Sequence, residues 1–101
     1  MKLIIQIPCL NEEANIADTL NDLPTSIQGI DEIEILIIDD GSKDNTVNIA
    51  LKNGADHVIS HTNNKGLAHA FSSGLTESLK LNADIIVNTD ADNQYQGKFI
   101  K

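Results

Sequence analysis

Short runs of apolar, mostly β-branched residues alternate along the chain with longer segments of helical periodicity. The apolar runs lie at Leu3–Ile7, Glu34–Ile38, Val58-Ile59 and Ile85–Val87. Runs of this length are typical of strands that are covered on both faces, as in parallel sheets. Parallel neighbours need crossover connections, which the helical segments between them can supply. The alternation therefore predicts an α/β fold with a three-layer, mostly parallel open sheet and the element order βαβαβαβ.

The segments between the strands predict three helices, because their apolar residues recur at intervals of three and four. We expect the first helix at about residues 12–23 and the third at about residues 66–81. Ser42 or Asp44 can cap the start of the second helix, and Asn53-Gly54 is a signal for its end.

Composition and charge limit the partners and the compartment that we expect. The 101 residues suffice for one domain, and no segment has the pattern of a signal peptide or a transmembrane helix. There are 15 acidic residues against 7 basic ones and no arginine, which gives a net charge of −8. Nucleic-acid binding needs clustered basic residues, so we expect no nucleic-acid partner. The single cysteine, Cys9, fits a reducing, cytoplasmic compartment.

Acidic or polar clusters directly follow three of the expected strands. They are Asn11-Glu12, Asp39-Asp40, and the pair Asp90 and Asp92. The carboxyl ends of parallel strands meet at one edge of the sheet, where open α/β folds bind their ligands. Each cluster alone is also compatible with a polar turn or a helix cap. The convergence of three clusters favours a ligand site.

The pair Asp90 and Asp92 favours a cation, because two carboxylates this close repel each other unless a cation or a strong donor lies between them. Oxygen ligands suit Mg²⁺ or Mn²⁺, which take substrate phosphates to complete their coordination. A phosphorylated ligand would meet an acidic protein here, so a divalent cation is the natural mediator.

The phosphate-binding loops of other nucleotide-binding folds are absent from the sequence. The turn after the first strand, Pro8–Glu12, contains no glycine and so lacks the dinucleotide fingerprint, and there is no Walker loop. A pyrophosphate therefore cannot lie on this helix start in the usual way. Pro8 is also expected to end the first strand, because proline has no N–H to donate to a ladder.

Four segments stand out together: IPCLNEEANI, ILIIDDGSKDNT, NNKGLAHAFSSGL and DIIVNTDADNQY. In this order and spacing they resemble the nucleotide-binding part of family 2 glycosyltransferases, which have the Rossmann-like GT-A fold. The likeness covers nearly the whole chain and is strongest to the polyprenol-phosphate (dolichol-phosphate) mannosyl- and glucosyltransferases. It implies a single nucleotide-sugar-binding domain over residues 1–101 that is a fragment of a longer glycosyltransferase, a hexosyltransferase.

The resemblance implies roles for individual residues. A UDP- or GDP-linked sugar would be bound by Pro8, Leu10, Glu12, Asp39, Asp40, Lys65, Gly66, Asp90 and Ala91. Within that set, the Asp39 carboxylate would hydrogen-bond the base. The Asp-x-Asp motif of Asp90 and Asp92 would hold Mg²⁺ or Mn²⁺ together with Gln94. The cation would stabilise negative charge on the leaving nucleotide.

The resemblance also implies where the remaining parts of the reaction would come from. In the family, the acceptor site and the general base belong to later sequence, so no residue up to Lys101 is assigned as the catalytic base. The sugar would pass to a lipid-phosphate or saccharide acceptor. A polyprenol-phosphate acceptor would place the parent protein at the cytoplasmic face of the membrane.

Two other functions remain open at this point. A phosphoacceptor receiver domain also has an open α/β sheet with strand-end aspartates that bind Mg²⁺, although its acidic pair follows the first strand. A binding module that holds a nucleotide without catalysis is the second alternative. Whichever function holds, a sheet that stops at its fourth strand leaves an unpaired edge and exposed apolar helix faces, so we expect the fragment to self-associate.

The remaining polar and aromatic candidates have structural interpretations. His57, His61 and His69 are scattered and are interpreted as surface or hydrogen-bonded histidines rather than metal ligands. Cys9 is expected to be a small buried hydrophobic residue, and Tyr95 a packing residue.

Overall fold

The computed structural model describes residues 1–61, 66–89 and 91 of the chain. These residues form strands and helices in strict alternation, as the sequence predicts. The elements are β1 (Lys2–Cys9), α1 (Ile16–Asn21), β2 (Glu32–Asp39), α2 (Thr46–Lys52), β3 (His57–Ser60), α3 (Leu67–Lys80) and β4 (Ile85–Asn88).

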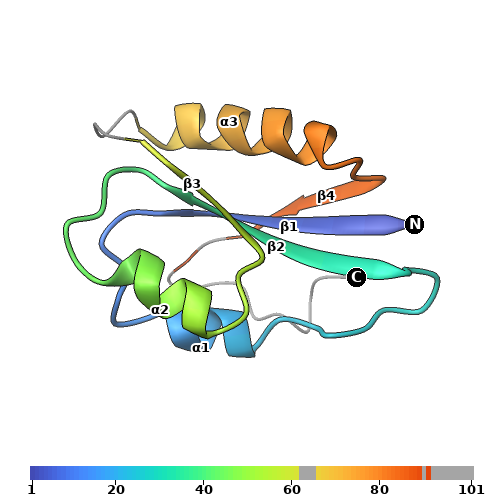
Figure 1. The fold of residues 1–101 in the computed structure, drawn as a ribbon, viewed down its shortest axis with the longest axis horizontal. Helices are drawn as coiled ribbons and strands as arrows, with labels where there is room; N and C mark the ends of the chain where they lie inside the picture. Colours follow the sequence, from blue (N-terminus) through green and yellow to red (C-terminus); the bar gives the residue numbers. More distant parts are fainter. Residues whose placement is uncertain (62–65, 90, 92–101) are drawn as a thin grey trace.

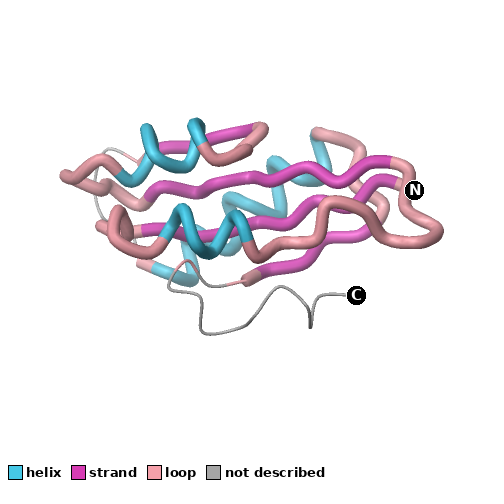
Figure 2. The backbone as a smooth tube through the Cα atoms, turned by 90° about the horizontal axis from the view of Figure 1, so that it is seen from below, coloured by secondary structure: helices cyan, strands magenta, loops and turns pink. Residues whose placement is uncertain are grey.

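The strands form one parallel sheet with the order β3-β2-β1-β4. Helices α1 and α2 cover one face and α3 covers the other, so the molecule has three layers (Figure 1). Figure 2, seen from the side of α1 and α2, shows the strands side by side between these two helices and α3. The predicted three-layer, parallel α/β sheet is confirmed.

Strand β1 lies inside the sheet, and its side chains alternate between two layers of core. Ile5 and Ile7 are fully buried on the face that packs against α1 and α2. Ile4 is fully buried on the opposite face, where it packs with Leu36 of β2 and Ala70 of α3. Burial on both faces explains why this strand is a continuous apolar run rather than an alternating one.

The direction in which the chain crosses the sheet reverses after β3. The chain moves outward from β1 to β2 and β3 through α1 and α2, and α3 then carries it back across the opposite face to β4. Strands β1 and β4 therefore flank a topological switch point, where open α/β sheets bind ligands at the carboxyl ends of the strands. A receiver-type sheet instead places β1 between β2 and β3, so the observed order does not fit that alternative.

The prediction that Pro8 ends the first strand is wrong. Pro8 pairs with Ile38, and β1 continues to Cys9. The carbonyl of Gln6 accepts the N–H of Thr89, which shows that Gln6 and, two residues later, Pro8 face the β4 side. Pairing with β4 ends at Gln6, so the missing N–H of Pro8 costs the sheet no hydrogen bond.

Gln6 is a polar residue at the centre of the sheet, and it is fully buried beneath α3. Its amide nitrogen lies 3.1 Å from the side-chain oxygen of Asn88 on β4. Helix α3 can pass over this side chain because residue 74 is glycine: a Cβ there would lie 2.6 Å from the Gln6 side-chain oxygen. The close approach thus fixes the distance between α3 and the middle of β1.

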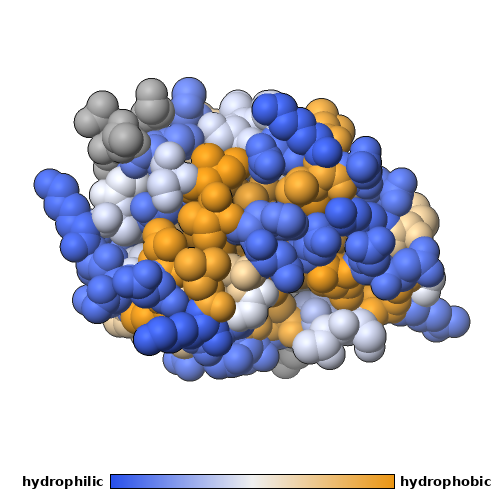
Figure 3. All heavy atoms as spheres, viewed as in Figure 1, coloured by the Kyte–Doolittle hydropathy of each residue, from blue (hydrophilic) through white to orange (hydrophobic). Residues whose placement is uncertain are grey.

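Strands β3 and β4 form the two edges of the described sheet. Figure 3 shows apolar side chains at the surface where β3 passes between α2 and α3. Leu51 of α2 and Phe71 of α3 are 52% and 42% exposed. Self-association is expected from an unpaired sheet edge and exposed apolar helix faces, and both features are present in the described residues. Self-association itself stays a prediction. In the described part of the chain, every helix is too short or too polar to cross a bilayer.

Candidate functional site

The loops that follow β1 and β2 are joined by reciprocal hydrogen bonds at the predicted edge of the sheet. The N–H groups of Asn11 and Glu12 donate to the hydroxyls of Ser42 and Thr46, both at 2.8 Å. In return, the side-chain carbonyl of Asn11 accepts the N–H of Lys43 at 2.8 Å. Two of the three polar clusters that the sequence predicted to converge therefore lie side by side.

Helix α1 begins at Ile16 rather than near residue 12, because residues 13–15 form a turn and Asn15, with φ −120°, lies outside the helical range. Asn11, before this turn, adopts a left-handed backbone with φ 52°. Ser42 binds Asn11 and does not cap α2. Asp44 accepts the N–H of Thr46 at 3.0 Å, and the Thr46 hydroxyl beside it lowers the pKa of the Asp44 carboxyl.

Asp39 ends β2 as a buried carboxylate, only 4% exposed. Its two oxygens lie 3.4 and 3.2 Å from the N–H of Ser42, and the described residues supply this carboxylate with no other hydrogen bond. A carboxylate can accept about four hydrogen bonds, so Asp39 keeps capacity for N–H donors of a ligand. Because unpaired buried charge is costly, such donors would be bound favourably.

Asp40, in contrast, is bound by protein groups on both oxygens. Its Oδ2 accepts the N–H of Gly66 at 2.9 Å, and its Oδ1 lies 3.1 Å from Nδ1 of His61. Two predicted site residues, Asp40 and Gly66, are thus in direct contact. The third residue, His61, could not be predicted as their partner, because it follows a different strand and has no characteristic spacing from the other two.

Ala91, the middle residue of the predicted Asp-x-Asp motif, is attached to α1. The hydroxyl of Thr19 donates to the Ala91 carbonyl at 2.8 Å, and the two residues are 2% and 4% exposed. The N–H of Thr89 continues the pairing with β1 to the residue before Asp90. Ala91 therefore lies at the carboxyl end of β4, on the edge where β1 and β2 also end.

The predicted metal ligands Asp90, Asp92 and Gln94, and the predicted donor contact Lys65, lie outside the described residues. Within the described ranges, no group of three acidic, histidine or cysteine side chains could hold a metal ion. The chemistry at this edge fits a divalent cation, since two carboxylates flank the anchored Ala91 in the sequence. The buried hydroxyl of Thr89, next to Asp90, also lacks a hydrogen-bond partner in the described part.

The other predicted nucleotide contacts lie around the end of β1. Pro8 is buried within the strand, whereas Leu10 is 38% exposed directly after it. Glu12 is partly exposed, and its carboxylate accepts a hydrogen bond from the Asn15 side chain at 3.3 Å. Cys9 is buried as predicted, and burial raises the pKa of its thiol far above the ordinary value. Leu10 and Glu12 therefore present surface to a ligand at this edge.

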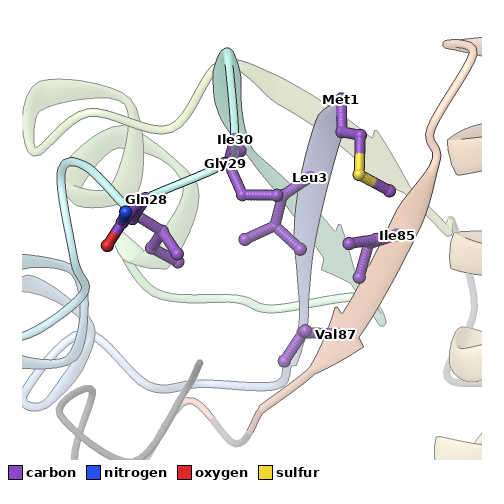
Figure 4. A pocket seen from close by; sticks show the side chains of 8 residues that line it. Met1, Leu3, Gln28, Gly29, Ile30, Ile85 and Val87 are labelled. Atoms are coloured by element: carbon purple, nitrogen blue, oxygen red, sulfur yellow. The ribbon is translucent and has the colours of Figure 1, made fainter.

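A separate cavity of about 310 Å³ lies at the other end of the strands (Figure 4). Leu3, Ile30, Ile85 and Val87 line it, together with Met1 and neighbouring residues of the loop before β2. Its lining is almost entirely apolar, so it does not suit a nucleotide diphosphate, which needs polar and charged partners. The candidate nucleotide site therefore remains the carboxyl edge of the sheet.

The Thr19–Ala91 bond predicts a measurable loss of stability. Thr19→Val keeps the side-chain volume but leaves the buried Ala91 carbonyl without its donor. We expect the free energy of unfolding to fall by about 1–3 kcal/mol, measured by urea titration with circular dichroism. Thr19→Ser retains the hydroxyl and is the matched control. Equal stability of wild type and Thr19→Val would show that this bond does not hold the end of β4.

The sequence matches the profile of Glycosyl transferase family 2 over residues 4–101. It is 36% identical over 105 residues to the UDP-N-acetylglucosamine--dolichyl-phosphate N-acetylglucosaminyltransferase of Methanococcus voltae, covering 88% of this chain and 40% of that protein. It is 32% identical over 103 residues to the dolichol-phosphate mannosyltransferase of Pyrococcus furiosus, covering 99% of this chain and 28% of that protein. The chain thus spans less than half the length of these relatives.

Solved structures agree with the sequence comparison. A mannosyltransferase from Pyrobaculum calidifontis in complex with GDP-Man and Mn²⁺ superposes with a TM-score of 0.75 at 25% identity, over 89% of this chain and 27% of that chain. Glucosyl-3-phosphoglycerate synthase from Mycobacterium tuberculosis, in complex with Mn²⁺, UDP and glucosyl-3-phosphoglycerate, gives a TM-score of 0.72 at 28% identity, over 89% of this chain and 33% of that chain. The fold is therefore the Rossmann-like GT-A fold, and the chain belongs to glycosyl transferase family 2.

Proposed function

We propose that this chain is the nucleotide-sugar-binding part of a glycosyltransferase and holds its donor at the carboxyl edge of the sheet. One observation carries the proposal: in a family 2 chain, the loops after β1 and β2 and the anchored Ala91 after β4 meet at the topological switch point. This is the position at which an open α/β sheet binds its ligand. The buried Asp39 carboxylate, with spare acceptor capacity, gives that position a specific partner for a base.

The donor would be a UDP- or GDP-linked sugar, with its base against Asp39 and Leu10. An N–H of the base would donate to the Asp39 carboxylate, and the exposed Leu10 and Glu12 would border the base and ribose. Lys65 would contact the donor together with Gly66, which immediately precedes α3. Support for this class of donor comes from relatives whose names state UDP-N-acetylglucosamine and from neighbours in complex with GDP-Man or UDP.

Asp90 and Asp92, with Gln94, would hold Mg²⁺ or Mn²⁺ beside the diphosphate. Both solved neighbours described above contain Mn²⁺, which supports a divalent cation in this chain. When bound, such an ion supplies Lewis-acid stabilisation of the negative charge that develops on the leaving nucleotide. In this chain, the Thr19–Ala91 bond would orient the two carboxylates on either side of Ala91. Asp39 would bind the base.

The parent protein would transfer the sugar to a lipid-phosphate or saccharide acceptor. A polyprenol phosphate is favoured because two relatives carry dolichyl-phosphate or dolichol-phosphate in their names. Such an acceptor would place the parent at the cytoplasmic face of the membrane. The general base would come from sequence beyond Lys101.

Asp39→Asn tests the base contact. The amide keeps an oxygen for the Ser42 N–H but removes the charge, and hydrogen bonds to charged groups contribute about 1.5–3 kcal/mol. We therefore expect the dissociation constant for UDP or GDP, measured by calorimetry, to rise about 10–100-fold. Asp18→Asn, at an exposed position of α1, makes the same chemical change away from the site. Unaltered affinity in Asp39→Asn would exclude Asp39 as the base-binding group.

A further inference from the structure

His61 and Asp40 form a buried pair next to the proposed donor site. Nδ1 of His61 lies 3.1 Å from Oδ1 of Asp40, and the two side chains are 9% and 7% exposed. The other ring nitrogen, Nε2, lies 3.1 Å from the hydroxyl of Ser73 on α3. The ring also meets His69 of α3 edge to face, with the centroids 5.0 Å apart. The pair therefore joins the ends of β2 and β3 to α3.

The hydrogen bonds of the two ring nitrogens define the tautomer of a neutral His61 ring. A carboxylate only accepts hydrogen bonds, so Nδ1 carries the proton and donates to Asp40. Nε2 then accepts the hydroxyl proton of Ser73. The order carboxylate, imidazole, hydroxyl is that of a serine hydrolase triad. The order of these groups does not by itself make a hydrolase, because nucleophilic catalysis also needs a substrate cavity and oxyanion donors at the hydroxyl.

The second carboxylate oxygen of Asp40 binds the backbone before α3. Oδ2 accepts the N–H of Gly66 at 2.9 Å. Gly66 immediately precedes α3 and has φ 92°, a conformation that glycine adopts without strain. Asp40 is 5% exposed, and a buried carboxylate keeps its position only while its donors are in place. A chain of contacts thus runs from His61 through Asp40 to the residue that begins α3.

We propose that His61 is a positioning residue for the donor site. By donating to Asp40, it orients the carboxylate that fixes Gly66 at the start of α3, beside the proposed donor site. Asp39 and Asp40 therefore have different tasks: Asp39 faces the nucleotide, and Asp40 faces the protein. This inference rests on the proposed function, since Gly66 matters to a ligand only if the donor binds at this edge.

Two substitutions of His61 separate its two contacts. The amide nitrogen of asparagine lies two bonds beyond Cβ, as Nδ1 does, so His61→Asn keeps a donor for Asp40. The amide of glutamine extends one bond further, as Nε2 does, so His61→Gln keeps a group near Ser73 and removes the donor to Asp40. Ser73→Ala is the matched control, because it removes only the contact on the far side of the ring.

The first readout is the dissociation constant of UDP or GDP with Mn²⁺, measured by calorimetry on variants that circular dichroism shows to be folded. We expect His61→Gln to weaken binding about tenfold, in the range seen when a supporting hydrogen bond is lost. His61→Asn and Ser73→Ala are expected to stay within about twofold of wild type, less than one such bond. Wild-type affinity in His61→Gln, or an equal loss in Ser73→Ala, would overturn the proposal.

The second readout is independent of any ligand. In amide hydrogen exchange followed by NMR, the Gly66 N–H should exchange faster in His61→Gln than in wild type and keep its protection in His61→Asn. Unchanged protection of Gly66 in His61→Gln would also overturn the positioning role. Failure of the wild-type chain to bind either nucleotide would be a failure of the proposed function, and the exchange data would still decide whether His61 holds Gly66.

Discussion

Asp92→Ala is expected to abolish the metal-dependent part of nucleotide binding. The substitution removes one of the two carboxylates that flank the anchored Ala91, and a neighbouring Asp90 alone leaves the cation without a chelating pair. Removal of groups that merely support a metal ligand costs about 10–100-fold in affinity, so loss of a ligand should exceed about 100-fold. Calorimetric titration of Mn²⁺ in the presence of UDP or GDP measures the effect.

Asp18→Ala is the control for the loss of one negative charge, because Asp18 is exposed on α1. It should bind Mn²⁺ and nucleotide like the wild type. Asp39→Asn should show the complementary pattern, with weaker nucleotide binding both with and without the metal. If Asp92→Ala retained full Mn²⁺ dependence, the metal site would have to be built from other residues.

Ile5→Ala is expected to remove a large share of the domain's stability. Ile5 is fully buried in β1, between β2 and β4, and packs with the core beneath α1 and α2. Truncating a buried isoleucine to alanine costs about 2–5 kcal/mol, because transfer free energy is lost and a cavity remains. Domains are stable by only about 5–15 kcal/mol in total. Urea unfolding followed by circular dichroism measures the loss.

Leu79→Ala gives the matched comparison, since Leu79 lies on α3 and is 66% exposed. Exposed substitutions usually change stability by less than about 0.5 kcal/mol. A similar loss in both variants would mean that the face carrying Leu79 is covered in solution, as self-association would require. Sedimentation of the wild type across a range of concentrations would then detect the dimer directly.

The fold could be predicted because its signals are local. Each buried strand is a continuous β-branched run, and each crossover has its own apolar periodicity, so alternation was enough to give the parallel three-layer sheet. The errors arose where tertiary contacts override local preference. Pro8 remains in β1 because its nitrogen faces a side on which pairing has already ended. The helix expected from residue 12 begins at Ile16, because residues 13–15 form a turn and Asn15 is not helical.

The candidate site was predictable only in part for the same physical reason. Asp39 and Asp40 are identical in type and adjacent, and no local pattern distinguishes the one with spare acceptors from the one bound by His61 and Gly66. Thr19 and Ala91 are 72 positions apart, and their bond depends on how α1 packs beside β4. Long-range side-chain hydrogen bonds of this kind follow from the assembled fold rather than from spacing.

The most direct test of the proposed donor site is calorimetric titration of UDP and GDP into the wild-type chain, with and without Mn²⁺. A family 2 chain whose β1, β2 and β4 ends form a donor site should bind one of the two nucleotides, and bind it more tightly when Mn²⁺ is present. That result would also identify the base. Absence of binding to both nucleotides with Mn²⁺ present, in a chain that circular dichroism shows to be folded, would contradict the assignment of this edge as a donor site.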